Sequence, residues 1–489
     1  MRSFLMLAFA AIVLSGCASS TGRGPDLQAI YQESAQKIGD ERNPVVVIPG
    51  ILGSTLKEKD SGRIVWGAFT YGAVDTDYPE GARTFALPMR KDATLGELRD
   101  GVVPDGVLES LDANVGLLRV RALEPYKGII ASLAAGRYVD RDLAKKAERA
   151  GTSEGPIDYA GLHYTCFQFD YDWRRDISES AAKLDELVRN AAELAGAARG
   201  DGKPAKVDIV AHSMGGLVAL YYLRYGAHPL PDDGSVPEPN WEGAKYVDRL
   251  IIVATPSAGS VLALKEMIEG VAYSPITPTY RAALLGTMPS IYQLLPRSRQ
   301  GRVVDEKTGT TVDLTDAATW EKYGWGLLDP KQDEYLKWLL PGVETREERR
   351  EIAREHLRKC LARAKQFHAA IDRPMAGGPP THIHLIAGDT LPTPSVLAVG
   401  SGERVRIRET APGDGTVTRA SALMDERTGR AWRARVETPI RWESVRFLPG
   451  DHIELTANAP FTDDLLFLLL EEPRGFDGMQ QAVASAKDN

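Results

Sequence analysis

The chain has 489 residues, of which 43% are hydrophobic and 26% charged, and its formal net charge at pH 7 is −8. This composition is typical of a globular protein with enough apolar side chains for one large core or two. Because acidic residues outnumber basic ones, the chain has no excess of Lys and Arg to neutralise phosphates, which argues against nucleic acid as a partner.

The N-terminus has the features of a processing signal. Arg2 supplies a positive charge, residues 4–14 are almost wholly apolar, and the tetrapeptide LSGC ends at Cys17. This pattern resembles a bacterial lipobox, which implies that residues 1–16 are a signal peptide and that Cys17 is lipidated after cleavage. The apolar run is too short to span a bilayer as a helix, so we expect attachment to the membrane through lipid.

The residues after Cys17 are small and polar, which predicts a flexible tether, residues 17–42, between the lipid and the folded part. Ala18 follows the cysteine, whereas in Gram-negative lipoproteins an aspartate at this position commonly retains the protein in the inner membrane. The resemblance to these signals therefore implies a location in the bacterial cell envelope, at the outer membrane facing the periplasm if the source is Gram-negative.

Short apolar runs rich in β-branched residues alternate with helical segments along the folded part, residues 43–480. Such alternation predicts an α/β fold with a mostly parallel central sheet. We read a further strand at 444–448 and a closing helix at 463–470, and a tail, residues 481–489, ends the chain. The five apolar runs are residues 45–48, 164–169, 207–210, 250–254 and 383–386.

Two long intervals interrupt this alternation, at about residues 54–160 and 260–380. Their content of Pro, Gly and charged residues predicts insertions on the core, and they are candidates for a cap and a lid. Within the second interval, residues 346–370 are highly charged but carry apolar residues at near-helical spacing, which predicts a helix with one packed face.

Nothing in the sequence indicates a metal ion or another cofactor. Cys166 and Cys360 lie far apart and no metal-ligand spacing surrounds either, and the sequence does not show whether they form a disulfide. His382 and His384 would share one face of a predicted strand, but no third ligand lies nearby, so we expect them to be buried in the strand.

The segment VDIVAHSMGGLVA, residues 207–219, places Ser213 between an apolar strand and the start of an apolar helix. This arrangement fits a nucleophile elbow, a tight strand-to-helix turn that exposes a serine hydroxyl. The usual pattern is G-x-S-x-G, and Ala211 departs from it in the first position, although alanine is small enough for such turns. An ordinary strand-to-helix turn is the alternative interpretation.

A nucleophilic serine needs a histidine to accept its proton and a carboxylate to orient that histidine. In α/β-hydrolases these residues follow in the order serine, acid, histidine. Of the histidines after Ser213, only His452 falls in a loop beyond the last predicted strands. We favour Asp414 as the acid because its glycine neighbours allow a tight loop, and Asp389 is the alternative. We interpret His212 as a packing or hydrogen-bonding residue.

Acyl transfer also requires donors for the oxyanion of the tetrahedral intermediate. The backbone amide of Met214, directly after the nucleophile, is the expected first donor. The second is expected in the loop after the first predicted strand, where Gly50 allows a turn that exposes the amide of Ile51.

Five segments, together with the position of His452, resemble the lecithin:cholesterol acyltransferase family, which includes lysosomal phospholipase and phospholipid:diacylglycerol acyltransferase. The resemblance implies an α/β-hydrolase fold with cap and lid, and a triad of Ser213, Asp414 and His452. It also implies transfer of a fatty acyl group from a lipid ester to the serine, and then to water or an alcohol. The segments are PVVVIPGILGS (44–54), FDYDWR (169–174), AHSMGG (211–216), ATPSAGS (254–260) and GDGTV (413–417).

The resemblance assigns two further roles and leaves one feature open. Residues 172–174, the DWR of the second segment, would buttress the site, and Trp66 would either line an acyl pocket or be an ordinary packed tryptophan. The animal enzymes carry a disulfide in an early lid loop, whereas this chain has no cysteine between Cys17 and Cys166. The shape of the lid, and with it the choice of substrate, therefore stays open.

We expect a lipid as substrate and the membrane as partner, and the sequence leaves the oligomeric state undetermined. Two other functions remain compatible with the sequence. One is a carboxylesterase or triacylglycerol lipase acting on other esters, which the same triad would serve. The other is a catalytically inactive envelope lipoprotein that keeps only the fold.

Overall fold

A computed structural model of the chain describes most of the folded part. The predicted signal peptide (1–16), Cys17, which is the predicted lipidation site, and the predicted tail (481–489) lie outside the described residues. The described residues are 25–37, 42–69, 72–108, 111–115, 118–123, 126–143, 165–200, 202–272, 277–375, 381–400, 405–427 and 435–473.

A six-stranded sheet with the order β15-β12-β10-β9-β1-β8 forms the centre of the protein, and all of its neighbouring strands are parallel. Five of the strands overlap the predicted apolar runs and β15 overlaps the further strand predicted at 444–448, so the predicted α/β fold with a mostly parallel sheet is confirmed. The strands are β1 (Val45–Ile48), β8 (Cys166–Gln168), β9 (Val207–His212), β10 (Val247–Val253), β12 (His382–Gly388) and β15 (Trp442–Leu448).

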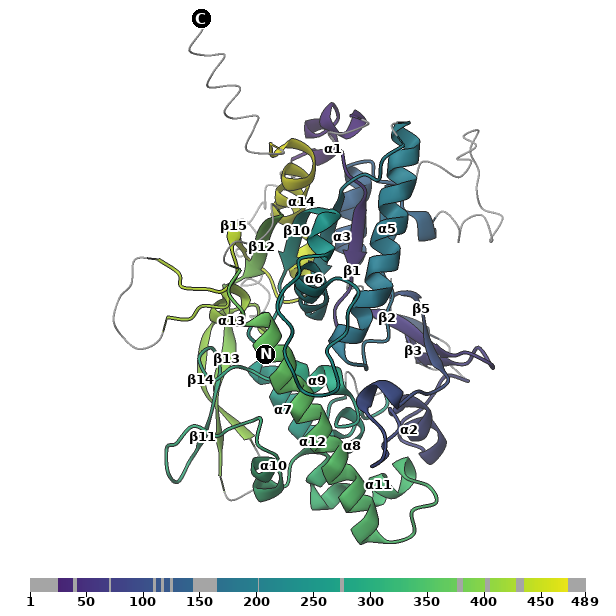
Figure 1. Ribbon diagram of the computed structural model, residues 1–489, viewed down its shortest axis with the longest axis vertical. Coiled ribbons are helices and arrows are strands. Elements are labelled where there is room, and N and C mark those ends of the chain that lie inside the picture. Colours follow the sequence, from purple (N-terminus) through teal and green to yellow (C-terminus); the bar gives the residue numbers. More distant parts are fainter. Residues whose placement is uncertain are drawn as a thin grey trace, which may run out of the picture.

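Helices cover both faces of this sheet, and the alternation of side chains along β1 shows how (Figure 1). Val46 and Ile48 belong to the core cluster that contains α5 and α6, whereas Val45 and Val47 belong to the cluster that contains α3 and α14. Because both faces are covered, the strand is an uninterrupted apolar run with every residue buried. These helices are α3 (Lys127–Ala135), α5 (Ser180–Arg199), α6 (Met214–Tyr225) and α14 (Ala459–Leu466).

The stretch predicted as a tether, residues 17–42, is partly folded. Residues Leu27–Ile30 form α1 and Ser34–Gln36 a 3-10 turn. Tyr31 is 3% exposed, and its hydroxyl donates to Asp463 Oδ1 of α14 at 2.7 Å. Residues 27–36 therefore do not belong to a flexible tether, because the Tyr31 ring in this stretch packs on the closing helix.

Among the described residues, the first long interval contributes two small sheets and the helices α2 and α3, and the second contributes mainly helices. Figure 1 shows α10, α11 and α12 at the end of the molecule opposite α1. The predicted charged helix is α12 (Arg346–Ile371), which packs against α9. Besides α3, the elements of the first interval are β2 (Ser54–Glu58), β3 (Ile64–Trp66), β4 (Ala68–Phe69), α2 (Pro79–Phe85), β5 (Val102–Val107), β6 (Leu111–Val115) and β7 (Leu118–Leu123). Those of the second are α7 (Val261–Glu269), α8 (Ala282–Leu285), α9 (Pro289–Gln293), β11 (Arg302–Asp305), α10 (Ala317–Tyr323) and α11 (Asp333–Leu339).

Two antiparallel strands between β12 and β15 were not predicted. They are β13 (Leu391–Val399) and β14 (Val405–Gly413), and β11 joins them in a separate three-stranded sheet. Strand β14 ends directly before Asp414, so this hairpin carries the preferred candidate acid back to the edge of the central sheet.

Cys166 and Cys360 are both buried free thiols. Within the described ranges, no group of three or more His, Cys, Asp or Glu side chains is arranged to hold a metal ion. No helix in the same ranges is both long and apolar enough to cross a bilayer.

Close packing of α3 on the segment that follows His452 generates a stability prediction. A Cβ at Gly128 would lie well inside van der Waals contact with the Thr456 carbonyl group, so Gly128→Ala forces α3 away from this segment. We expect the free energy of unfolding to fall by about 1–3 kcal/mol, measured by urea denaturation. Gly101→Ala is the control, because nothing lies within 4 Å of the added Cβ. Equal stability of the two variants would contradict the packing.

Candidate active site

Ser213 occupies a strained turn between β9 and α6. Its φ is +53° and its ψ is −128°, a conformation that L-residues rarely adopt and that costs about 1–3 kcal/mol. The turn is possible because its neighbours lack side chains. A Cβ at Gly50 would lie 2.7 Å from the Ser213 Cβ, and one at Gly215 would lie 2.5 Å from the Pro49 carbonyl oxygen. The geometry is therefore that of the predicted nucleophile elbow.

Ala211, which departs from the usual elbow pattern, lies inside the sheet. It is fully buried in β9, opposite Ile48 of β1 and Ile252 of β10. One methyl group is accommodated there without disturbing the turn that follows.

The structure brings Ser213, His452 and Asp414 together from three loops at the same edge of the sheet. The Ser213 Oγ lies 2.9 Å from His452 Nε2, and His452 Nδ1 lies 2.8 Å from Asp414 Oδ2. A neutral imidazole with its proton on Nδ1 donates to Asp414 and accepts the Ser213 hydroxyl at Nε2. This arrangement can remove the proton of the serine hydroxyl as the oxygen attacks an ester.

Asp414 is held in its ionised form. Its other carboxylate oxygen, Oδ1, accepts the amides of Thr416 at 2.9 Å and Val417 at 2.7 Å. Burial alone would raise the pKa of Asp414, but His452 and these hydrogen bonds hold it below its usual value. The alternative acid, Asp389, forms an ion pair of 2.9 Å with Arg419. The structure thus places Asp414 in hydrogen-bond contact with His452, whereas the carboxylate of Asp389 contacts Arg419.

His212 supports the histidine loop. Its Nε2–H donates to the backbone carbonyl oxygen of His452 at 2.9 Å. Burial, with a smaller contribution from nearby His452, lowers the pKa of His212 to about 3, so its ring is neutral at physiological pH. The sequence predicted a packing or hydrogen-bonding role for His212, and the structure identifies the group that it holds.

Four aromatic side chains fix the backbone of the loop after β1, residues 49–54. The loop contains a tight turn, because the Gly53 amide donates to the Gly50 carbonyl oxygen at 3.1 Å and Leu52 between them has a φ of +64°. The sequence did not single out Tyr126, since no local pattern distinguishes it from other buried tyrosines. The contacts are Trp66 Nε1–H to the Leu52 carbonyl (2.8 Å), the Tyr171 hydroxyl to the Pro49 carbonyl (2.9 Å), Trp173 Nε1–H to the Ser54 carbonyl (3.2 Å) and the Gly50 amide to the Tyr126 hydroxyl oxygen (2.7 Å).

The two predicted oxyanion donors flank the nucleophile. Ile51 lines the same cavity as Ser213, and Met214 is the first residue of α6. Neither backbone amide has an acceptor among the described residues. Both can therefore donate to an oxyanion without breaking an existing hydrogen bond.

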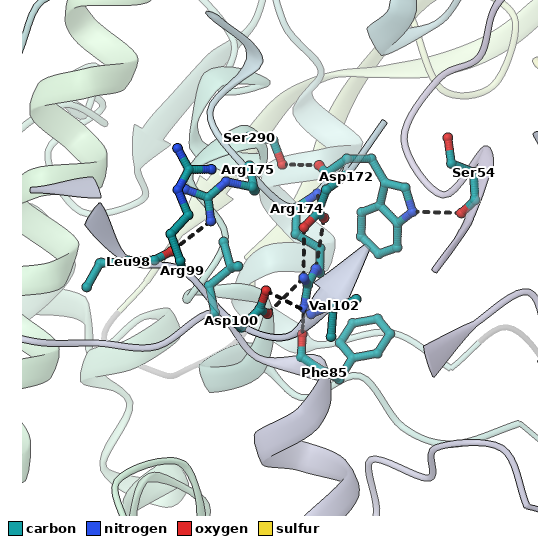
Figure 2. Close-up of polar contacts among 12 residues, drawn as sticks. Ser54, Phe85, Leu98, Arg99, Asp100, Val102, Asp172, Arg174, Arg175 and Ser290 are labelled. Carbon is teal, nitrogen blue, oxygen red and sulfur yellow. Dashed lines mark hydrogen bonds and ion pairs between the residues drawn. The ribbon is translucent and has the colours of Figure 1, made fainter. Parts of the chain in front are cut away.

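The DWR segment forms a buried ionic cluster behind this loop (Figure 2). Arg174 is fully buried and makes two hydrogen bonds to Asp172, at 2.9 and 2.8 Å, with further contacts to Asp100 at 2.9 Å and to the Phe85 carbonyl oxygen at 2.8 Å. Burial alone would raise the pKa of Asp172, but Arg174 holds it below its usual value, so the pair stays charged. The cluster fixes the backbone on either side of Trp173. This is the buttress that the resemblance implied.

A cavity of about 450 Å³ has Ser213 and His452 in its wall. Most of its other lining side chains are apolar or aromatic. Trp66 is one of them, with its ring edge-on to Trp173 at 5.8 Å between centroids and to Tyr280 at 5.6 Å. Trp66 is therefore both a wall of the cavity and a packed residue. The size and character of the cavity suit the hydrocarbon part of an ester.

Comparison with known proteins yields one family match. Residues 162–333 match the family model described as lecithin:cholesterol acyltransferase. The predicted resemblance is confirmed. The family match supports a hydrolase or acyltransferase that acts on lipid esters. Comparison with curated protein sequences finds no match.

Comparison with solved structures finds matches at low sequence identity. A chain in the crystal structure of the Tle4-Tli4 complex is 16% identical with a TM-score of 0.52, over 88% of this chain and 98% of that one. The Bacillus licheniformis lipase BlEst2 in its propeptide form is 12% identical with a TM-score of 0.33, over 90% of this chain and 53% of that one. Phospholipase PlaB from Legionella pneumophila is 13% identical with a TM-score of 0.29, over 71% and 59%. With its parallel sheet and elbow, this chain has the α/β-hydrolase fold, as predicted.

The contact of Asp414 with His452 generates a test of the acid. Asp414→Asn removes the acceptor that orients the imidazole, so we expect the rate of Ser213 labelling by a fluorophosphonate to fall by about three to four orders of magnitude. The control is Asp389→Asn, which breaks only the ion pair with Arg419 and should leave the rate within about twofold. If the Asp389 variant loses reactivity and the Asp414 variant keeps it, the assignment of the acid is wrong.

Proposed function

We propose that the protein is a serine-dependent lipid acyl hydrolase or acyltransferase. It transfers a fatty acyl group from a phospholipid or related lipid ester, through acyl-Ser213, to water or an alcohol. The observation that carries this proposal is the hydrogen-bonded chain from Ser213 through His452 to Asp414, set in the wall of an apolar cavity. The match of residues 162–333 to an acyltransferase family supports the class of substrate.

Acylation begins when the ester carbonyl carbon reaches Ser213 Oγ. His452 Nε2 takes the hydroxyl proton as Oγ attacks, and ionised Asp414 stabilises the imidazolium without taking a proton itself. The carbonyl oxygen becomes an oxyanion and accepts the amides of Ile51 and Met214. The tetrahedral intermediate collapses when His452 returns the proton to the leaving alcohol oxygen, and the acyl group remains on Ser213.

Deacylation repeats these steps with a different nucleophile. Water or an alcohol approaches the acyl carbonyl, His452 removes its proton, and the same two amides stabilise the second oxyanion. Return of the proton to Ser213 Oγ releases the fatty acid or the new ester. Which acceptor reacts depends on how well the site excludes water.

The same proposal attaches the enzyme to a membrane. The LSGC tetrapeptide supports lipidation at Cys17 and an anchored location in the bacterial cell envelope. Ala18 supports the outer membrane, facing the periplasm, if the source is Gram-negative. An anchored enzyme would find its lipid substrate in the same envelope.

The decisive variant is Ser213→Ala, assayed by release of fatty acid from phospholipid vesicles. Loss of the nucleophile should lower the rate by about three orders of magnitude or more. Ser61→Ala is the control, because this exposed serine contacts only surface groups and its loss should leave the rate unchanged.

A substrate panel tests the class of ester in the same assay. It contains phospholipid, triacylglycerol and a short aryl ester, each with and without an alcohol acceptor, with products identified by mass spectrometry. Release of fatty acid from phospholipid, or its transfer to the alcohol, supports the proposal. Activity confined to the short aryl ester, or fatty-acid release that survives in Ser213→Ala, contradicts it.

A further inference from the structure

Helix α7 places a carboxylate in the wall of the cavity that contains Ser213. The face of α7 that lines this cavity carries Leu262, Ala263, Glu266 and Met267. Glu266 is the one Asp or Glu among the described residues of the lining, and no Lys or Arg accompanies it there. Glu266 is thus the one side chain of its kind in a described lining that is otherwise mostly apolar or aromatic.

The Glu266 carboxylate has no hydrogen-bond donor among the described residues. The neighbouring Lys265 is engaged instead by Glu269, one turn along on the helix. Burial raises the pKa of Glu266, and Lys265 opposes this only in part. Partly buried carboxylates are normally paired, because removing one from water without a partner costs several kcal/mol. Glu266 is partly exposed, so its carboxylate can accept a hydrogen bond from a group that enters the cavity, and no described residue supplies one.

A plain hydrocarbon chain in the cavity would leave the Glu266 carboxylate without a hydrogen-bond donor. Once it filled the cavity, it would displace water from Glu266 and supply no hydrogen bond. A substrate with a hydroxyl group at this depth would give the carboxylate its donor. A hydroxyl can pair with Glu266 whether the carboxyl is ionised or protonated, since it both donates and accepts.

An ammonium group fits the site less well. It carries three donors, of which Glu266 would satisfy only part, and the other polar side chains of the lining are hydroxyls, indoles and imidazoles rather than carboxylates. Bringing a cation into an apolar cavity also requires its desolvation together with that of the carboxylate. A hydroxyl makes one strong hydrogen bond at a smaller desolvation cost.

We propose that Glu266 is a specificity-determining residue that selects esters bringing a hydroxyl group into the cavity. This inference rests on the proposed function, since it assigns a substrate class to the same site. The hydroxyl can belong to the acyl chain or to the alcohol part of the ester. Both sources offer the same donor to Glu266, and the substrates below separate them.

Two matched pairs of esters test this selection. In the first, p-nitrophenyl dodecanoate is compared with p-nitrophenyl esters of hydroxydodecanoic acids that carry the hydroxyl at successive positions. In the second, alkyl decanoates are compared with hydroxyalkyl decanoates of equal length. We expect the wild-type protein to favour the hydroxylated member of at least one pair by about tenfold or more in kcat/KM, and the pair that responds identifies the source.

Three variants locate the preference on Glu266. Glu266→Leu and Glu266→Ala remove the acceptor, so the preference should fall to within about twofold while hydrolysis of the plain ester rises. Glu266→Gln keeps a carbonyl acceptor and should keep part of the preference. Glu193→Gln, which changes an exposed carboxylate on α5, is the control and should keep all of it.

The outcomes separate this inference from the proposed function. The inference is overturned if the wild-type protein shows no hydroxyl preference in either pair, or if the preference survives in Glu266→Leu or Glu266→Ala. It is also overturned if an ester with an ammonium group at the same position is preferred. In each of these cases Ser213-dependent hydrolysis of the plain esters leaves the proposed function standing. Hydrolysis that persists in Ser213→Ala contradicts the proposed function itself.

Discussion

At Ser213 the chain passes from β9 into α6 through a left-handed backbone conformation that is costly for a residue with a side chain. The conformation persists because the first loop of the sheet, at Pro49 and Gly50, packs directly against the turn, and because Gly50 and Gly215 leave room for it. The turn points the Ser213 hydroxyl at His452 and places the amide of Met214 beside it. The geometry of the proposed nucleophile and of one proposed oxyanion donor thus depends on a single close contact between two strand ends.

Around this contact, the charged side chains, with one exception, lie apart from the apolar wall of the cavity. Asp414 and the DWR cluster are buried but fully paired, so their charges cost little and hold backbone in place. Aromatic side chains anchor the loop after β1, residues 49–54, and at the same time form the apolar wall, as Trp66 does. The exception is Glu266, a carboxylate in that wall with no hydrogen-bond donor among the described residues, which is why we propose it as a point of substrate selection.

Local sequence patterns predicted the strands of the central sheet and the serine. The order of residues along the chain predicted the histidine and narrowed the choice of acid. Buried parallel strands are short apolar runs, and chain order left His452 as the base. The hairpin of β13 and β14 was missed because its second strand is polar and exposed and lacks an apolar run. No local pattern predicts that Tyr126 anchors the loop after β1, because the two are far apart in the sequence. The same holds for the position of Glu266 in the cavity wall, which is built from distant segments. The tether was predicted too long because the burial of Tyr31 against α14 is also a distant contact.

The central claim is that one covalent acyl intermediate on Ser213 carries the reaction. The most direct measurement is to inactivate the protein with a long-chain alkyl fluorophosphonate, whose phosphorus takes the place of the ester carbonyl, and to locate the adduct by peptide mass spectrometry. The account predicts one adduct, on the peptide containing Ser213, with fatty-acid release from phospholipid vesicles lost in proportion to its formation. An adduct on another residue, or a fully modified protein that still releases fatty acid, would contradict it.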